Sequence, residues 1–167
     1  MITPDTYYVS DNGVFPGNKL PVLHYKRPLH IPFLFAARYV KNIFRKHDWN
    51  NTWRNGIYTY HHYHSNTHEA MAVIKGSTTL LLGGENGKQV VLRKGDIIVI
   101  PAGVAHKNLG RMKDVICVGG YPEGRDFDMN YGTPGERPAA DKNIENLPIP
   151  STGPLAGSED PLVRLWK

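Results

Sequence analysis

Four residues whose side chains can bind metal ions stand out in the 167-residue chain: His62, His64, Glu69 and His106. If residues 57–64 form a strand, His62 and His64 share one face, because alternate side chains of a strand point the same way. Glu69 follows in the next strand, and His106 comes after a separate strand and loop. Three neutral imidazoles and one carboxylate suit Fe, Mn, Ni, Co or Zn and leave positions open for water or substrate. We therefore predict that these four residues hold one divalent transition-metal ion.

Two neighbouring histidines are weaker candidates for this site. Strand alternation places His68 opposite Glu69 and His61 opposite His62, so both are expected to face away from the ion. His68 could still replace a ligand or orient one, whereas His61 is expected to be structural. The alternative for the four predicted ligands is ordinary hydrogen bonding, but burying them around one cavity without a shared cation or network is costly.

Tyr58, Tyr60 and Met71 are expected to face the same interior as the predicted ligands. Tyr58 and Tyr60 share the strand face of His62, and Met71 shares that of Glu69. A tyrosine there can contact substrate or transfer a proton, so Tyr58 and Tyr60 are the candidate catalytic residues. Packing is their alternative role, since large side chains normally fill the interior of a small β-barrel.

The segment that carries these residues has the signature of an all-β fold. Short β-prone runs separated by glycine-containing turns lie at residues 78–82, 88–92, 97–100 and 115–121. Asn86-Gly87, between the first two runs, is a strong hairpin signal because both residues accept positive φ. The pattern predicts an antiparallel sandwich or barrel rather than a parallel sheet covered by helices.

One amphipathic helix is predicted before this β-rich part. Apolar residues recur at three- and four-residue steps from Phe33 to Phe44, with polar and basic residues between them. Pro32 suits the first turn, so the helix is expected over residues 32–47 with its apolar face packed inward. Residues 122–161 are rich in proline and glycine and are expected to be mostly irregular, either wrapping the barrel or covering a partner surface. Residues 162–166 could form a final strand.

Composition excludes several classes of protein. The formal net charge is +5, but the basic residues are scattered and no recognition-helix motif is present, so no nucleic-acid partner is expected. No apolar run approaches the ~18 residues that span a bilayer, and no signal peptide is apparent, so neither membrane association nor export is expected. The single cysteine, Cys117, allows no intrachain disulfide and is expected to be a buried hydrophobe. These features predict a cytoplasmic protein.

Two motifs in the β-rich part are similar to those of the cupin family. The first runs Gly56, five residues, His62-Tyr63-His64, four residues, Glu69, six residues and Gly76; the second runs Gly95, five residues, Pro101-Ala102-Gly103, two residues and His106. The resemblance implies a cupin double-stranded β-helix, or jelly-roll barrel, with the three histidines and Glu69 as metal ligands. The family's second motif usually ends on Asn four residues after its histidine, whereas this chain has Gly110 there and Asn108 earlier. The local hydrogen bonding of that Asn is therefore in question.

Further segments resemble the YjlB-like cupins, small single-domain bacterial proteins without an established activity. These segments are Trp53–Tyr58, His61–Glu69, Tyr121–Gly124 and Pro134–Pro138. The resemblance covers nearly the whole chain. It implies a single cupin domain with an N-terminal extension and helix at residues 1–55, a barrel core at 56–121 and a wrapping tail at 122–167.

The resemblance implies a metal-dependent protein that acts on a small molecule. Cupins with similar ligands catalyse dioxygenation, isomerisation and decarboxylation, and three histidines with one glutamate around iron or manganese favour dioxygenase-type oxidoreductase chemistry, an inference by analogy. A non-catalytic module that binds metal or a small ligand stays open, as does a metal-free sugar isomerase-type cupin. Cupins also commonly form homodimers through a β face, for which Ala70, Ala72 and Ile74 are available unless the helix at 32–47 covers them.

Overall fold

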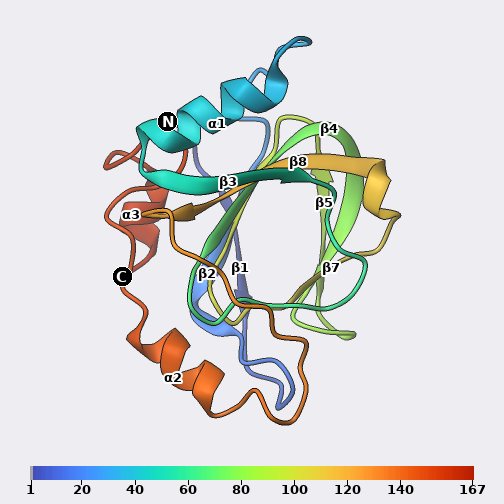
Figure 1. Cartoon of the computed structure of the whole chain (residues 1–167), viewed down its shortest axis with the longest axis vertical. Helices are drawn as coiled ribbons and strands as arrows, with labels where there is room; N and C mark the ends of the chain where they lie inside the picture. Colours follow the sequence, from blue (N-terminus) through green and yellow to red (C-terminus); the bar gives the residue numbers. More distant parts are fainter. Residues whose placement is uncertain (1) are drawn as a thin grey trace.

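The computed structural model describes residues 2–167 and shows two antiparallel sheets that share one long strand, β4 (Glu69–Leu82) (Figure 1). The first half of β4 pairs with β6 (Ile97–Ile100) and β8 (Val115–Pro122), and the second half pairs with β5 (Lys88–Arg93) and β7 (His106–Asn108). The strand passes between the sheets at Gly76, whose φ is +75°. A Cβ there would lie 2.0 Å from the carbonyl oxygen of Asp114, so the crossing requires glycine.

The larger sheet extends beyond the segment expected to form the barrel core. Its strand order is β1-β2-β6-β4-β8-β3, in which β1 is Asp5–Val9, β2 is Asn18–Tyr25 and β3 is Trp49–Asn55. The sheet therefore includes strands from residues 5–55 as well as from the expected core, and the all-β cupin class is confirmed. β3 escaped prediction because three of its seven residues are asparagine, which has a low strand preference. It becomes a strand through its antiparallel pairing with β8.

The runs predicted as strands at residues 78–82, 88–92, 97–100 and 115–121 all form strands. β4 joins the first of these runs to the strand expected at Glu69, and a 3-10 turn at Met112–Asp114 precedes β8. The β4–β5 hairpin turns where predicted, but positive φ angles occur at Gly83 and Gly84 rather than at Asn86-Gly87. Gly87 is needed for a different reason, because a Cβ there would lie 1.7 Å from the carbonyl oxygen of Leu82.

Apolar side chains form a core on each face of the larger sheet. The inner core lies between the sheets and includes Met71, Val73, Ile98, Ile100, Val115 and Cys117. The outer core lies between the larger sheet and the helices and includes Ala70, Ala72, Ile97, Val99 and Val118. β6 contributes to both cores, which explains why all four of its residues are β-branched and apolar. β4 and β6 are thus held firmly in the middle of the molecule.

The helix α1 (Ala36–Lys46) covers the outer core through the buried side chains of Val40 and Phe44. It begins four residues later than predicted, and residues 33–35 project beyond its N-terminal end (Figure 1). Ala70, Ala72 and Ile74 lie buried in the outer core. The chain itself therefore covers the face on which two copies were expected to pair. That face is not available for the predicted homodimer.

The C-terminal region passes around the outside of the barrel and contains two helices, α2 (Ala139–Asn146) and α3 (Pro161–Leu165) (Figure 1). The possible strand at residues 162–166 is wrong. Asp160 caps α3 by accepting a hydrogen bond from the backbone N–H of Leu162, and proline occupies the first helical position. No helix in the described residues is long and apolar enough to cross a bilayer.

Candidate metal centre

Residues 57–64 do not form the regular strand that was predicted. Backbone hydrogen bonds join Asn108 to Tyr58 and His106 to His62. Between these two pairings the segment advances by four residues, whereas β7 advances by two. The two extra residues bend outward, as in a β-bulge. The bulge carries Tyr60 to the surface, while His62 is still directed inward, only 4% exposed.

Three of the four predicted ligands form a compact histidine cluster. One ring nitrogen from each of His62, His64 and His106 lies within 4.8 Å of the other two, and all three side chains are buried. The rings of His62 and His106 are the closest pair, with centroids 4.1 Å apart. Segments far apart in the chain are brought together here because the bridge between His62 and His106 aligns them directly.

Each histidine of the cluster is held by a backbone carbonyl. Nδ1 of His62, His64 and His106 lies 3.1, 2.6 and 3.2 Å from the carbonyl oxygens of Tyr60, Asp128 and Val104, respectively. A carbonyl only accepts, so each Nδ1 donates its proton, and Nε2 of the neutral ring is left with a lone pair. This is the arrangement that metal-binding histidines adopt in proteins.

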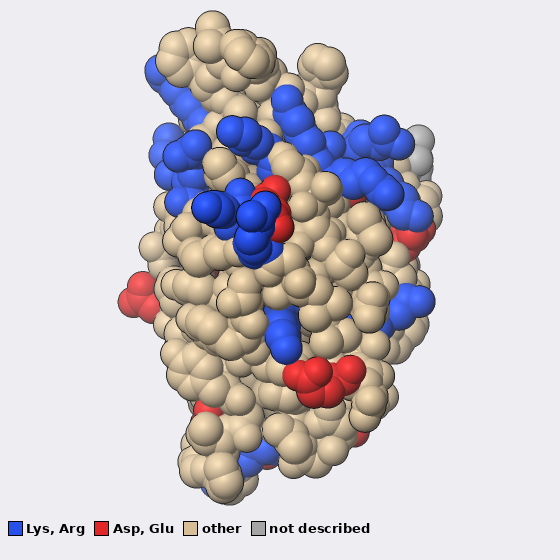
Figure 2. All heavy atoms as spheres, turned by 90° about the vertical axis from the view of Figure 1, so that its right-hand side faces the viewer, with Lys and Arg blue, Asp and Glu red and all other residues tan. Residues whose placement is uncertain are grey.

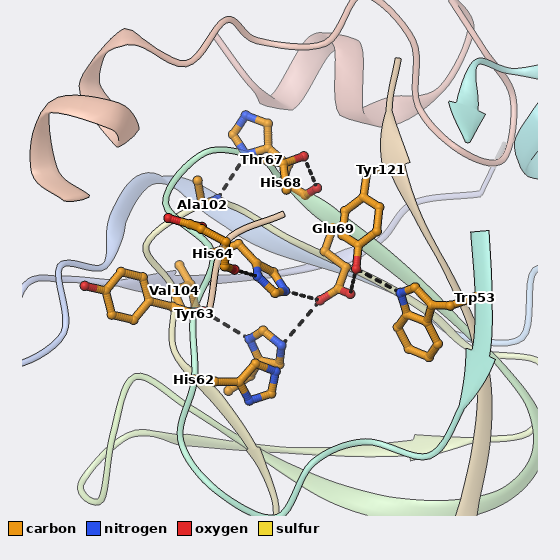
Figure 3. Close-up of polar contacts among 12 residues, drawn as sticks. Trp53, His62, Tyr63, His64, Thr67, His68, Glu69, Ala102, Val104 and Tyr121 are labelled. Atoms are coloured by element: carbon orange, nitrogen blue, oxygen red, sulfur yellow. Dashed lines mark hydrogen bonds and ion pairs between the residues drawn. The ribbon is translucent and has the colours of Figure 1, made fainter. Parts of the chain in front are cut away.

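Glu69, the fourth predicted ligand, lies beside the cluster at the start of β4 (Figure 3). Its Oε2 is 3.4 Å from Nε2 of both His64 and His106, and the side chain is 4% exposed. Its other oxygen, Oε1, accepts a hydrogen bond of 3.1 Å from the hydroxyl of Tyr121, which in turn accepts one of 2.9 Å from the Trp53 indole. The carboxylate is thus oriented with one oxygen toward the histidines.

The electrostatics of the cluster favour a bound cation. Burial and the neighbouring His106 lower the pKa of His62 to about 3. Burial also opposes protonation of His64, but the carboxylate of Glu69 outweighs it and raises the pKa of His64 above its ordinary value. Burial acts to raise the pKa of Glu69, yet His64 and His106 hold it below its usual range. Glu69 therefore stays an ionised carboxylate beside the histidines and favours positive charge there.

The donor set fits a transition-metal ion. Among the residues that the structure describes, Nε2 of His106 is buried and has no hydrogen-bond partner apart from the 3.4 Å ion-pair contact with Glu69, although a buried polar atom normally has one. A metal ion among the three Nε2 atoms and Oε2 of Glu69 would supply the partner that His106 lacks. Three imidazoles and one carboxylate are donors that borderline first-row metals accept.

A cavity of about 250 Å³ opens onto this centre. Its apolar walls include Trp53, Tyr58, Met71, Tyr121, Phe127 and Met129, and Arg54 lies among its polar lining residues. Tyr58 and Met71 face the cavity as expected. Tyr60 does not line it, because the bulge turns this residue outward: it is 44% exposed and stacks on Tyr58 with ring centroids 5.0 Å apart.

The other candidate residues lie outside the cluster. Nδ1 of His68 accepts a hydrogen bond of 3.0 Å from the backbone N–H of Ala102 (Figure 3). The His68 ring packs on Trp166, with ring centroids 4.8 Å apart. His61 points away and lies 2.8 Å from a carboxylate oxygen of Glu85. Cys117 is buried in the inner core, and burial raises its thiol pKa, so it is no reactive nucleophile.

The cupin motif usually has Asn at the position of Gly110, and here Asn108 makes the local hydrogen bonds instead. Its Oδ1 accepts from the Thr78 hydroxyl and from the backbone N–H of Gly110. Its Nδ2 donates to the carbonyl oxygens of Ile57 and Arg111, each at 3.2 Å. The Asn108 side chain therefore ties the end of β7 to its neighbours despite the departure from the family motif.

Sequence reasoning missed the residues that support the centre. Tyr121 follows Val115, Cys117 and Gly119 at two-residue steps in β8, so strand alternation could have placed it in the interior. Trp53 lies in the strand that escaped prediction, and Gly119 makes room for it: a Cβ there would lie 2.0 Å from the indole. The loop that supplies Phe127, Met129 and the Asp128 carbonyl had no sequence signal.

Comparisons with known proteins agree with this architecture. The family model described as "Cupin domain" matches residues 54–112. The uncharacterized protein YjlB of Bacillus subtilis is 36% identical over 162 residues, which cover 96% of this chain and 95% of that protein.

Two solved structures show a more distant likeness. Acireductone dioxygenase from Bacillus anthracis, with cadmium ion in its active centre, has 15% identity and a TM-score of 0.42 over 64% of this chain and 82% of its own. The epimerase RmlC of Legionella pneumophila has 12% identity and a TM-score of 0.38 over 73% of this chain and 74% of its own. Likenesses this distant carry no argument about the chemistry of this chain.

Proposed function

The chain belongs to the cupin family, in the group of its relative YjlB, and from this premise we propose that it is a metal-dependent enzyme acting on a small molecule. The observation that carries the proposal is the set of three buried imidazoles whose Nδ1 atoms all face carbonyls, leaving three Nε2 lone pairs beside one buried carboxylate. His62, His64, His106 and Glu69 are the proposed ligands.

The cavity supports a small, largely apolar substrate. Six aromatic or thioether side chains line it, and a polar group of the substrate such as a hydroxyl or thiol would lie at the histidine end. Arg54 is placed to attract an acidic group of the same molecule. Phe127 and Met129 would exclude water from the centre once substrate is bound.

The protein groups around the centre have separable roles. A bound transition metal supplies Lewis acidity and, if it is iron, reactivity toward O2, which is why we favour dioxygenase-type oxidoreductase chemistry. Tyr121 orients Glu69 through its hydroxyl. Tyr58 lies with its ring centroid 5.4 Å from that of His62 and is the side chain best placed to move a proton to or from substrate. Tyr60 would act only through its stacking on Tyr58.

The test is oxygen consumption by iron-loaded protein across a panel of small phenols and thiols. We expect uptake by the wild type and loss of uptake in His106→Ala, with His68→Ala as the matched control because His68 is an equally buried histidine outside the cluster. Equal uptake by wild type and His106→Ala would refute the dioxygenase proposal. Tight binding of a panel compound without turnover would instead favour a binding module, and purified protein that lacks metal would favour a metal-free isomerase.

A further inference from the structure

Three consecutive apolar side chains project into solvent at the N-terminal end of α1. Phe33, Leu34 and Phe35, here called the apolar tip, are 95%, 64% and 77% exposed. Figure 1 shows the segment rising beyond the end of the helix and away from the barrel. Water-exposed phenylalanine is unfavourable in isolation, and three adjacent apolar residues at a projecting point are a feature of surfaces that bind a partner.

The tip is held in place by the chain on both sides. Ile31 before it and Val40 after it are buried in the outer core. Phe35 has φ +58° and ψ +27°, a left-handed conformation that bulky residues rarely adopt. Such strain persists where the surrounding structure imposes it and is common at functional positions. The fold therefore holds the tip in a defined, projecting conformation.

The positive charge of the protein is concentrated in the segment that carries the tip. Residues 26–47 contain six Lys or Arg and no Asp or Glu, which leaves 14 basic and 15 acidic residues in the rest of the chain. The whole net charge of +5 thus arises from this segment, at +6 against −1 elsewhere. Lys26 pairs with Asp5 at 2.6 Å. No ion pair with a carboxylate involves the other five cations, Arg27, Arg38, Lys41, Arg45 and Lys46, in the part of the chain that the structure describes.

Four of these cations, Arg38, Lys41, Arg45 and Lys46, lie on α1, the helix that follows the tip. Arg38 and Arg45 are exposed on α1 itself, which runs directly from the tip. Figure 2 shows Lys and Arg side chains over much of the upper part of one face, with a few acidic side chains among them. Projecting apolar side chains flanked by cations are typical of proteins that bind peripherally to membrane surfaces.

We propose that the apolar tip and the basic segment 26–47 dock this protein on the surface of an anionic lipid bilayer. The phenylalanine and leucine side chains would enter the boundary between headgroups and acyl chains, and the cations would contact lipid phosphates. A second copy of the chain fits this surface poorly, because it would bring two uncompensated positive segments together. A nucleic acid would engage the cations but leave the tip in water.

This inference departs from the sequence-based expectation that no membrane is involved. The periodicity assigned Phe33 to the buried face of a helix starting at Pro32, which would have left no apolar surface to dock. The structure starts the helix at Ala36 and exposes the residues before it. The proposed contact is peripheral and needs no membrane-spanning helix.

Sedimentation with phospholipid vesicles tests the proposal. The metal-loaded protein should pellet with phosphatidylcholine vesicles containing about one-third phosphatidylglycerol and at least about tenfold less with pure phosphatidylcholine, since each cation near an anionic surface contributes about fivefold. Raising the salt from about 0.1 M to about 1 M shortens the screening length from about 10 Å to about 3 Å and should weaken binding strongly.

Matched variants separate the two parts of the surface. Phe33→Ser with Phe35→Ser should reduce vesicle binding at least about tenfold, whereas Tyr8→Ser, a 73% exposed aromatic on β1, should not. Arg38→Glu should weaken binding more than Lys142→Glu, which makes the same change in net charge on the exposed surface of α2. All variants should keep the circular dichroism spectrum and melting temperature of the wild type, which shows that they are folded.

Three outcomes would overturn the proposal. One is equal pelleting by the wild type and the Phe33→Ser, Phe35→Ser variant. Another is a dimer in gel filtration that this variant dissociates, without vesicle binding by either protein, which would assign the tip to a second copy. The third is binding to an oligonucleotide, but not to vesicles, that Arg38→Glu weakens and the double Phe variant leaves unchanged.

Discussion

Backbone carbonyls, rather than side chains, orient the three histidines of the cluster. The carbonyls come from the bulge at Tyr60, the turn at Val104 and the loop at Asp128, so the geometry of the centre depends on three separate stretches of backbone. Glu69 is different, because it is oriented by the side chains of Tyr121 and, through it, Trp53. Single substitutions can therefore disturb the carboxylate more easily than the imidazoles.

Tyr121→Phe should weaken metal binding about tenfold to a hundredfold, the usual effect of removing a group that orients a ligand. The variant loses the hydrogen bond to Glu69 Oε1 and leaves the Trp53 indole N–H without its acceptor. Titration with Co2+, followed by its visible absorption, measures the affinity. Tyr131→Phe, at a half-exposed tyrosine outside the cavity lining, is the control; equal affinities in the two variants would contradict the assigned role of Tyr121.

Metal affinity should fall at acidic pH. In the metal-free protein Glu69 raises the pKa of His64 above its ordinary value of 6.5, so below that raised pKa a proton occupies His64 and must leave when metal binds. The apparent affinity should therefore drop about tenfold per pH unit below the raised pKa and level off above it. Glu69→Gln should shift this dependence to lower pH, although its affinity is weaker. An affinity unchanged between about pH 5 and 8 would exclude this competition.

At the scale of elements, the loop after β8 closes one side of the centre. Asp128 holds that loop against the residue following His64: its carboxylate accepts from the backbone N–H of Ser65 at 2.7 Å and from the Ser65 hydroxyl, and also from Asn130 Nδ2 at 2.9 Å. The same residue presents its carbonyl oxygen to His64. The loop's anchoring and the histidine's orientation therefore depend on one position.

Asp128→Ala should lower both the stability and the metal affinity of the protein. Loss of charge-assisted hydrogen bonds costs about 2 kcal/mol in the free energy of unfolding, and the freed loop would no longer hold the His64 ring. Urea denaturation and metal titration measure the two effects. Asp126→Ala is the matched control, since its carboxylate is exposed and, in the described residues, makes a single 3.5 Å contact, with Asn51. Reduced stability with unchanged metal affinity would separate the loop from the centre.

At the scale of the whole molecule, the proposed ligands link the β4 strand, the segment before it and β7. A metal ion that binds only the folded chain should stabilise it by about 2.7 kcal/mol at a hundredfold excess over its dissociation constant. For a domain of this size the melting temperature should rise by about 5–10 °C. Calorimetry with and without a chelator measures the shift. His106→Ala should show no metal-dependent shift, and an equal shift in this variant would place the stabilising metal elsewhere.

The sequence determined the fold class and the gathering of the three histidines. Their positions depend on local rules, namely alternation along strands, the turn at Pro101-Ala102-Gly103 and motif spacing, and the structure keeps that outcome even where a bulge replaces the expected strand. Whether the three histidines and Glu69 ligate a metal stays a prediction.

Only the tertiary structure decided which residues surround the centre and which surface is left open. Trp53 donates to Tyr121, and Tyr121 donates to Glu69, across strands far apart in the sequence. The pairing of β8 with β3 on one side and β4 on the other creates these contacts. Periodicity marks apolar residues but does not say what covers them: Ala70 and Ala72 proved buried, whereas Phe33 proved exposed. The physical reason is that burial depends on contacts between distant segments, which local spacing does not encode.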